Sequence, residues 1–183
     1  PHHLTLTDER VGDYDTNAKM KPPLCEESDR LALIAAIESG VIDCIATDHA
    51  PHAPNLKADT FDRAPFGIIG METAFPVLHT AFVATGRWTL DFLIDRMSIA
   101  PARVMNRARW GRLEVGQPAH IVLLDTDAEF VMEREHIGSR SVNCPWLGQQ
   151  IRGRAVLTIA SGHLAYADAS RLPALASSVP IPT

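Results

Sequence analysis

The stretch "ESDRLALIAAIESGVIDCIATDHAPH" (residues 27–52) joins a helical pattern to a short apolar run and then to a polar cluster. Apolar residues recur with helical spacing over 27–40, where Ser28 is a suitable N-cap and Gly40 a suitable stop. The run "VIDCIAT" (41–47) is typical of a strand that is buried on both faces of a parallel sheet. Since a helix followed by such a strand is an α/β unit, this stretch predicts an α/β fold.

The composition is that of an ordinary globular protein. Of the 183 residues, 46% are hydrophobic and 21% are charged, and the net charge is -5. That charge argues against nucleic acid or an anionic membrane as a partner, and the apolar runs fall far short of the ~20 residues of a membrane span. The three cysteines are widely spaced and form no CxxC pair, which indicates neither a disulfide framework nor a cysteine zinc site. With no signal-peptide pattern either, we expect a cytoplasmic protein.

The rest of the chain predicts helices first and strands afterwards, with a change near residue 110. Pro76 either kinks the first of these helices or marks its first turn, and Pro101 breaks the second. The expected elements are loops over 1–24 and 48–67, helices over 71–86 and 89–106, strands over 120–132 and 155–167, and an irregular tail over 177–183. We therefore expect two parts, 1–110 and 111–183. Neither is complete by itself, because an isolated few-stranded sheet leaves open edges.

Three polar side chains, Asp48, His49 and His52, follow the predicted strand. In parallel α/β folds and barrels, function is located at the carboxyl ends of the strands. An Asp there can bind a divalent metal through one oxygen and accept a proton with the other, and the resulting acid can protonate a leaving nitrogen. The alternative is structural: the Asp can be a helix cap, and both histidines can be hydrogen-bonded loop residues. HxxH in a proline-containing loop is not a helical zinc motif.

Longer motifs connect this cluster with a known family. "TDHAPH", then Lys57, then "APFGIIGMETAFPVL" (64–78) resembles the dihydroorotases of the amidohydrolase superfamily, especially the long-chain bacterial class. "PHHLTLTDE" and "DTNAKMKPPL" match the same family in the same order, and "GRLEVGQPAHIVLLD" resembles the return of an amidohydrolase chain into its small β domain. Related allantoinases and dihydropyrimidinases share the general plan but usually differ in these stretches.

The resemblance implies a (β/α)8 barrel with a binuclear zinc centre and the reversible interconversion of dihydroorotate and N-carbamoyl-aspartate in pyrimidine synthesis. It implies that 1–110 is the carboxyl-terminal part of the barrel, with its last strand at 41–47, and that 111–183 is part of the small β domain and a tail.

The resemblance also implies roles for single residues. Asp48 is the metal ligand and the general acid/base, His52 contacts the substrate carboxylate, and Phe66 and Gly67 contact the substrate ring through backbone groups. Glycine suits such a close backbone approach. Other motif residues would support the site or fix its loops: His2, His3, His49, Asn17 and Lys19.

The match fails in two ways. This sequence lacks most of the family's metal ligands, namely the HxH, the bridging carboxylate or carbamylated lysine, and two further histidines. One Asp alone cannot hold two zinc ions. We therefore expect the carboxyl-terminal half of a dihydroorotase, inactive alone and partnered by its amino-terminal half. Local departures also occur: Lys21 replaces a substrate-contacting Asn, Cys25 replaces an Arg, and His120 replaces an Asp. Lys21 can still pair with a substrate carboxylate, so it is kept as a candidate substrate contact that departs from the family's Asn.

These departures leave three hypotheses. The first is part of an active zinc dihydroorotase, which would form a homo-oligomer. The second is part of a catalytically inactive homologue that assembles with aspartate carbamoyltransferase. The third is part of a related cyclic amidase such as allantoinase. Assays on dihydroorotate and on allantoin separate the first hypothesis from the third.

Overall fold

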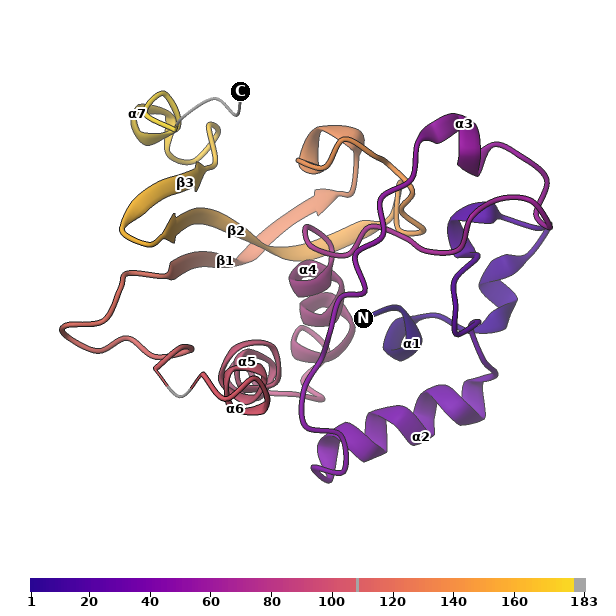
Figure 1. Cartoon of the computed structure of the whole chain (residues 1–183), viewed down its shortest axis with the longest axis horizontal. Coiled ribbons are helices and arrows are strands. Elements are labelled where there is room, and N and C mark those ends of the chain that lie inside the picture. Colours follow the sequence, from indigo (N-terminus) through magenta and orange to yellow (C-terminus); the bar gives the residue numbers. More distant parts are fainter. Residues whose placement is uncertain (108, 180–183) are drawn as a thin grey trace.

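A computed structural model describes residues 1–107 and 109–179. A three-stranded antiparallel sheet in the order β1-β2-β3 lies above a group of helices, as seen in Figure 1. The α-helices are α1 (His2–Thr5), α2 (Glu27–Glu38), α3 (Pro54–Lys57), α4 (Ala74–Leu78), α5 (Leu90–Ile94), α6 (Ala100–Val104) and α7 (Pro173–Ala176), and the strands are β1 (Ile121–Val131), β2 (Gln150–Ala160) and β3 (His163–Ala167). Shorter 3-10 turns cover Asp8–Val11, Thr16–Ala18 and Arg134–His136, and π-helical turns cover His79–Val83 and Asp95–Ile99.

The helix predicted over 27–40 is confirmed as α2. It begins one residue before the predicted cap, because Glu26 rather than Ser28 takes the N-cap position. Gly40 follows the helix with φ +79, a conformation that glycine adopts without strain. Ile34 and Ile37 are buried against the apolar side chains of α1, α4 and α5, which fixes the inner face of α2.

The strand predicted at 41–47 is wrong. The segment is extended and runs from the end of α2 toward α3 (Figure 1), but it belongs to no sheet in the described part of the chain. Val41 is 78% exposed, so the run is not buried on both faces either. Its backbone contacts are with helices instead, since the Ile45 N–H donates to the Arg96 carbonyl at 3.0 Å. The apolar composition of 41–47 is suited to a buried strand. A strand also needs a neighbouring strand to pair with, and 41–47 meets none among the described residues.

The predicted helices over 71–86 and 89–106 are present, but π-helical turns interrupt their α-helical structure. Pro76 lies in the first turn of α4, the second of the two predicted alternatives, and α4 continues into the π-helical turn His79–Val83. The helix over 89–106 is not broken at Pro101. Proline occupies the second residue of α6, where it is tolerated, and a π-helical turn precedes it.

The strand predicted over 120–132 is confirmed as β1, whereas the one over 155–167 is two strands. β2 turns back into β3 at Ser161 and Gly162, which have φ values of +51 and +81. Of the predicted tail, 180–183 lies outside the described residues, and α7 precedes it.

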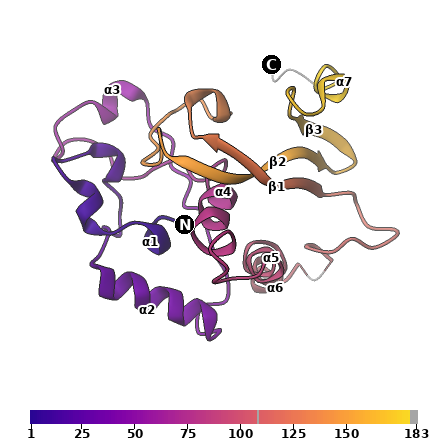
Figure 2. The same cartoon turned by 180° about the vertical axis from the view of Figure 1, so that it is seen from behind.

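The sheet packs on α4, as Figure 2 shows from behind. Ile151 of β2 and Met132 are buried in one core cluster with Val77 of α4. The His79 Nδ1–H donates to the Arg152 carbonyl at 3.0 Å, which fixes β2 against the end of the helix. Segments from both sides of residue 110 therefore share a core. In the described part of the chain, no helix has the length and apolar character needed to cross a membrane.

Candidate functional site

Asp48 lies exposed at the end of the extended segment and has φ +49. Positive φ is uncommon for residues other than glycine, although Asp tolerates it better than most, and such conformations occur preferentially at functional sites. The carboxylate lies close enough to His3 to oppose, in part, the lowering of the His3 pKa that burial causes. The fold therefore places the two motifs "TDHAPH" and "PHH" side by side.

His2 and His3 are neutral histidines with unused ring nitrogens. Burial lowers the pKa of His2 to about 3, because the imidazolium would lose its hydration. His2 Nδ1 and His3 Nε2 are buried without a hydrogen-bond partner among the described residues. Such orphaned atoms have a desolvation cost, so two unsatisfied polar atoms lie in the motif that meets Asp48 through His3.

The described residues do not by themselves form a metal centre. No group of three or more His, Cys, Asp or Glu side chains converges to hold an ion in 1–107 and 109–179. A zinc ion usually takes about four ligands, and Asp48 supplies one. The metal-binding side chains of this chain are thus too few for a zinc centre, which would need further ligands from other protein segments.

His49 is a hydrogen-bonded loop histidine, as its structural interpretation predicts. Its Nδ1 accepts from the backbone N–H groups of Gly70 and Met71 at 3.0 and 3.2 Å. Nδ1 is therefore unprotonated, and Nε2 carries the hydrogen toward Ser139 Oγ at 3.4 Å. Ser139 Oγ in turn donates to Glu72 Oε1 at 2.6 Å. This chain of contacts ties the loop after 41–47 to the start of α4.

His52, Phe66 and Gly67 lie together, because the segments 49–52 and 66–69 run side by side. His49 and Ile68 form a parallel bridge, and the Ala50 N–H donates to the Ile68 carbonyl at 2.8 Å. The His52 Nε2–H donates to the Phe66 carbonyl at 2.7 Å. The structure thus brings together three of the residues predicted to bind substrate.

The approach of the two segments requires glycine at Gly67. Its φ is +113, and a Cβ built there would lie 2.5 Å from Ala50 Cβ and 3.4 Å from His52 Nε2. Contacts under 3 Å between carbon atoms are not tolerated without movement. The absence of a side chain at this residue is what keeps His52 within hydrogen-bonding distance of the next loop.

Lys19 and Lys21 both approach the exposed Phe66 ring. Lys19 Nζ lies 4.5 Å and Lys21 Nζ 6.0 Å from the ring centroid. Lys19 is buried and donates to the carbonyls of Asp62 and Ala64 at 3.0 and 2.7 Å, so it fixes this loop. Lys21 is exposed, which leaves its ammonium free to meet an anion beside Phe66.

Lys57 is a second buried lysine under the same loop. Its ammonium donates to the carbonyls of Pro65 and Gly67 at 3.0 and 3.1 Å. Burial lowers its pKa to about 8, because the ammonium loses its hydration, and the positive charge of Lys19 lowers the pKa further. The side chain therefore supports the backbone of 65–67 at the cost of a buried charge.

This cost makes the stability contribution of Lys57 depend on pH. Between pH 8 and 10.5 the unfolded chain binds more protons at this residue than the folded chain does, so folding is favoured as pH rises. We expect the free energy of unfolding of the wild-type chain, relative to Lys57→Met, to rise by about 2 kcal/mol between pH 7.5 and 10.5. Urea titrations at several pH values measure this difference. A difference between the wild-type chain and Lys57→Met that falls as the pH rises would contradict the assignment.

Several residues of this corner were not predicted from the sequence. Glu72 lies just before α4, and the other three lie in the loop between β1 and β2: Ser139, Ser141 and Asn143. The one available signal is a buried polar residue within the apolar stretch "VNCPW", which indicates a hydrogen-bonded side chain rather than a surface one.

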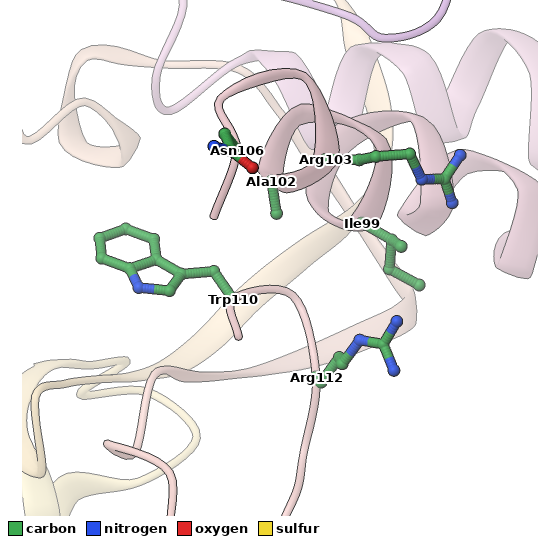
Figure 3. A pocket seen from close by; sticks show the side chains of 6 residues that line it. All are labelled: Ile99, Ala102, Arg103, Asn106, Trp110 and Arg112. Carbon is green, nitrogen blue, oxygen red and sulfur yellow. The ribbon is translucent and has the colours of Figure 1, made fainter. Parts of the chain in front are cut away.

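Asp48 lines neither of two pockets in the described part of the chain. One of about 130 Å³ is formed by α6 and the loop that follows it (Figure 3), where Trp110 and Arg112 face Ile99 and Ala102, and no predicted site residue lines it. A second, of about 520 Å³, is open and is lined by Tyr14, Asp59, Thr60, Phe61 and Asp62. The second is near the predicted substrate contacts, because the Lys19 ammonium lies 5.4 Å from the Phe61 ring and also contacts Phe66.

The chain belongs to the Amidohydrolase family, whose sequence profile matches residues 2–165. Within that family it is similar to bacterial dihydroorotases, as the motifs predicted. The dihydroorotase of Bacillus pumilus (strain SAFR-032) is 47% identical over 168 residues, which is 92% of this chain and 39% of that protein. The dihydroorotase of Bacillus subtilis (strain 168) is 48% identical over 168 residues, with the same coverage of 92% and 39%. The chain thus spans about two fifths of the length of these relatives.

Solved structures of hydantoinases share the fold. L-hydantoinase (dihydropyrimidinase) from Arthrobacter aurescens superposes with a TM-score of 0.79 at 25% identity, covering 90% of this chain and 38% of that one. D-hydantoinase (dihydropyrimidinase) from Thermus sp. gives a TM-score of 0.74 at 27% identity, covering 88% and 36%. The expected amidohydrolase superfamily is confirmed, whereas the part of a (β/α)8 barrel assigned to residues 1–110 stays a prediction.

Proposed function

We propose that the protein to which this chain belongs is a dihydroorotase, which interconverts dihydroorotate and N-carbamoyl-aspartate. The observation that carries the proposal is the identity of 47% to a dihydroorotase across 92% of the chain. The segments 49–52 and 66–69, which belong to the motifs of that family, lie in backbone contact. In this proposal 1–110 contributes the last part of a (β/α)8 barrel, and 111–183 belongs to a small β domain.

Asp48 is the proposed proton-transfer residue. The proposal rests on its exposed carboxylate, which lies at the end of an extended segment and interacts with the neighbouring His3. A carboxylate can take a proton while a nucleophile attacks the ring carbonyl and can return it to the departing ring nitrogen. His52, Phe66 and Gly67 would orient the ring and its carboxylate, and Lys21 would add a positive charge at the edge of the site.

The family is generally metal-dependent, and the proposed cofactor is zinc. When bound, zinc would polarise the amide carbonyl and supply an activated water. In the assembled protein Asp48 would be one of its ligands, and the remaining ligands must come from outside these 183 residues.

We expect the 183-residue chain to bind less than one zinc ion per molecule. Among the described residues, no three His, Cys, Asp or Glu side chains converge, which leaves too few donors for tetrahedral coordination. Metal analysis after dialysis against micromolar zinc measures the occupancy, with the chimera described below as the positive control. Two tightly held zinc ions per isolated chain would overturn this expectation.

The proposed activity is tested with a chimera in which this chain replaces its matching segment of the Bacillus subtilis dihydroorotase. We expect the chimera to hydrolyse dihydroorotate and to show little activity on allantoin or hydantoin. Preference for allantoin or hydantoin would replace the proposal with another cyclic amidase. A folded chimera that is inactive on all three substrates would favour the role of an inactive partner of aspartate carbamoyltransferase. The size of the chimera in solution tests the expected homo-oligomer.

A further inference from the structure

Asn143 is a buried asparagine in the loop between β1 and β2, far in sequence from the residues discussed above. Its side chain is 2% exposed. Nδ2 donates to the carbonyls of Ala50 and Gly67 at 2.9 and 3.1 Å. Oδ1 accepts from the backbone N–H of His52 at 3.2 Å and from Ser141 Oγ at 2.6 Å. One side chain thus joins the loop of Ala50 and His52 to that of Gly67.

The four hydrogen bonds use the whole capacity of the amide. An asparagine side chain has two N–H donors and two acceptor lone pairs, and all four are engaged here. Only one orientation satisfies the site, because a carbonyl must meet a donor and an N–H must meet an acceptor. No other common side chain of this size has the same balance. Ser and Thr are too short, and Asp lacks the two donors.

The neighbouring backbone extends the same contact. The Asn143 carbonyl accepts from the Ile69 N–H at 3.0 Å, and the Ser141 hydroxyl that contacts Asn143 Oδ1 also lies against the His52 carbonyl, so its one hydrogen is shared between these two acceptors. The loop 141–143 therefore holds both segments that carry the predicted substrate contacts. In contrast, it makes no contact of this kind with Asp48 in the described structure.

We propose that Asn143 is a positioning residue for substrate binding, which sets the spacing between His52 and the Phe66–Gly67 backbone. This inference rests on the proposed function. Asn143 acts through Ala50, His52 and Gly67 and does not itself touch substrate. The consequence is that a loop between two strands of the β-rich segment, and not only the "TDHAPH" and "APFG" motifs, determines the affinity for the substrate ring.

The first test separates positioning from folding by kinetics. In the chimera, Asn143→Ala should raise KM for dihydroorotate about 10- to 100-fold while kcat changes little, because contacts made equally in the ground and transition states are lost. A merely structural role would lower the concentration of active enzyme, which reduces apparent kcat and leaves KM unchanged. Asn55→Ala is the matched control, since Asn55 is exposed in α3 and should leave both constants unchanged.

The second test uses Asn143→Asp, which keeps the size and the acceptor for the His52 N–H. As a carboxylate it cannot donate to the Ala50 and Gly67 carbonyls, whereas the protonated acid can donate to one of them. Burial raises the pKa of such an acid, so its protonated fraction increases as the pH falls. We expect the ratio of KM between Asn143→Asp and the unsubstituted chimera to fall several-fold between pH 8 and pH 6. A ratio that is constant or rises toward acid would overturn the proposal.

A third measurement does not depend on activity. In the 183-residue chain, the His52 amide hydrogen should exchange with solvent at least tenfold faster in Asn143→Ala than in Asn55→Ala, because its acceptor is removed. If the chimera is inactive, the proposed function fails and this exchange decides the positioning role alone. Unchanged exchange at His52, or unchanged KM in an active chimera, overturns the inference.

Discussion

Asp48→Asn should lower kcat for dihydroorotate hydrolysis by about 1,000-fold in the chimera with the Bacillus subtilis enzyme, within the range that a positioned acid/base contributes. Asn has nearly the same size and keeps one carbonyl oxygen, but it can neither take up nor return a proton at neutral pH. The amide is also a weaker ligand for a divalent metal than a carboxylate. The measurement is steady-state hydrolysis of dihydroorotate with zinc in excess.

The control for Asp48→Asn is Asp43→Asn on the same extended segment. Asp43 is also exposed, and the contact recorded for it is made by its carbonyl, which accepts from Arg96 at 3.0 Å. Its carboxylate therefore has no part in the proposed chemistry, and the variant should keep kcat within about twofold. Zinc content measured in both variants separates lost proton transfer from lost metal. Loss of activity below tenfold in Asp48→Asn, with zinc bound, would assign the proton transfer to another group.

The parts of the fold that were predictable are those with local causes. The spacing of apolar residues places α2, and alternation places β1, because each pattern reflects one face of the element itself. The segment 41–47 shows the limit of this reasoning. Its apolar side chains indicated a buried strand, but a strand exists only with partners, and the described residues provide helices beside it.

The candidate site likewise contains residues that local motifs predict and one that they do not. Asp48, His52 and Gly67 could be found because they stand in short contiguous motifs, and Gly67 has a physical reason that is visible in sequence, namely a glycine beside an aromatic in a loop. Asn143 could not, because its partner His52 lies 91 positions away and nothing local requires an asparagine. Long-range hydrogen bonds of single polar residues depend on how whole segments pack, which one sequence does not reveal.

Gly67→Ala should destabilise the 183-residue chain by roughly 2–4 kcal/mol. Two costs add. The backbone at φ +113 is one that residues with a Cβ rarely adopt, and the new Cβ would lie 2.5 Å from Ala50 Cβ. Relief requires the segments 49–52 and 66–69 to separate, which would lengthen the His52 Nε2–H bond to the Phe66 carbonyl. We therefore expect KM for dihydroorotate in the chimera to rise at least tenfold as well.

Gly86→Ala separates the two costs. Gly86 also has positive φ, +78, but a Cβ there meets no atom within 4 Å, so this variant has conformational strain without a clash. It should cost about 1 kcal/mol in urea unfolding and leave KM unchanged. The excess in Gly67→Ala then measures the contact with Ala50. Equal losses in the free energy of unfolding in the two variants would mean that segments 49–52 and 66–69 move apart at little cost. The close approach of Gly67 to Ala50 and His52 would then have no role in holding the substrate contacts together.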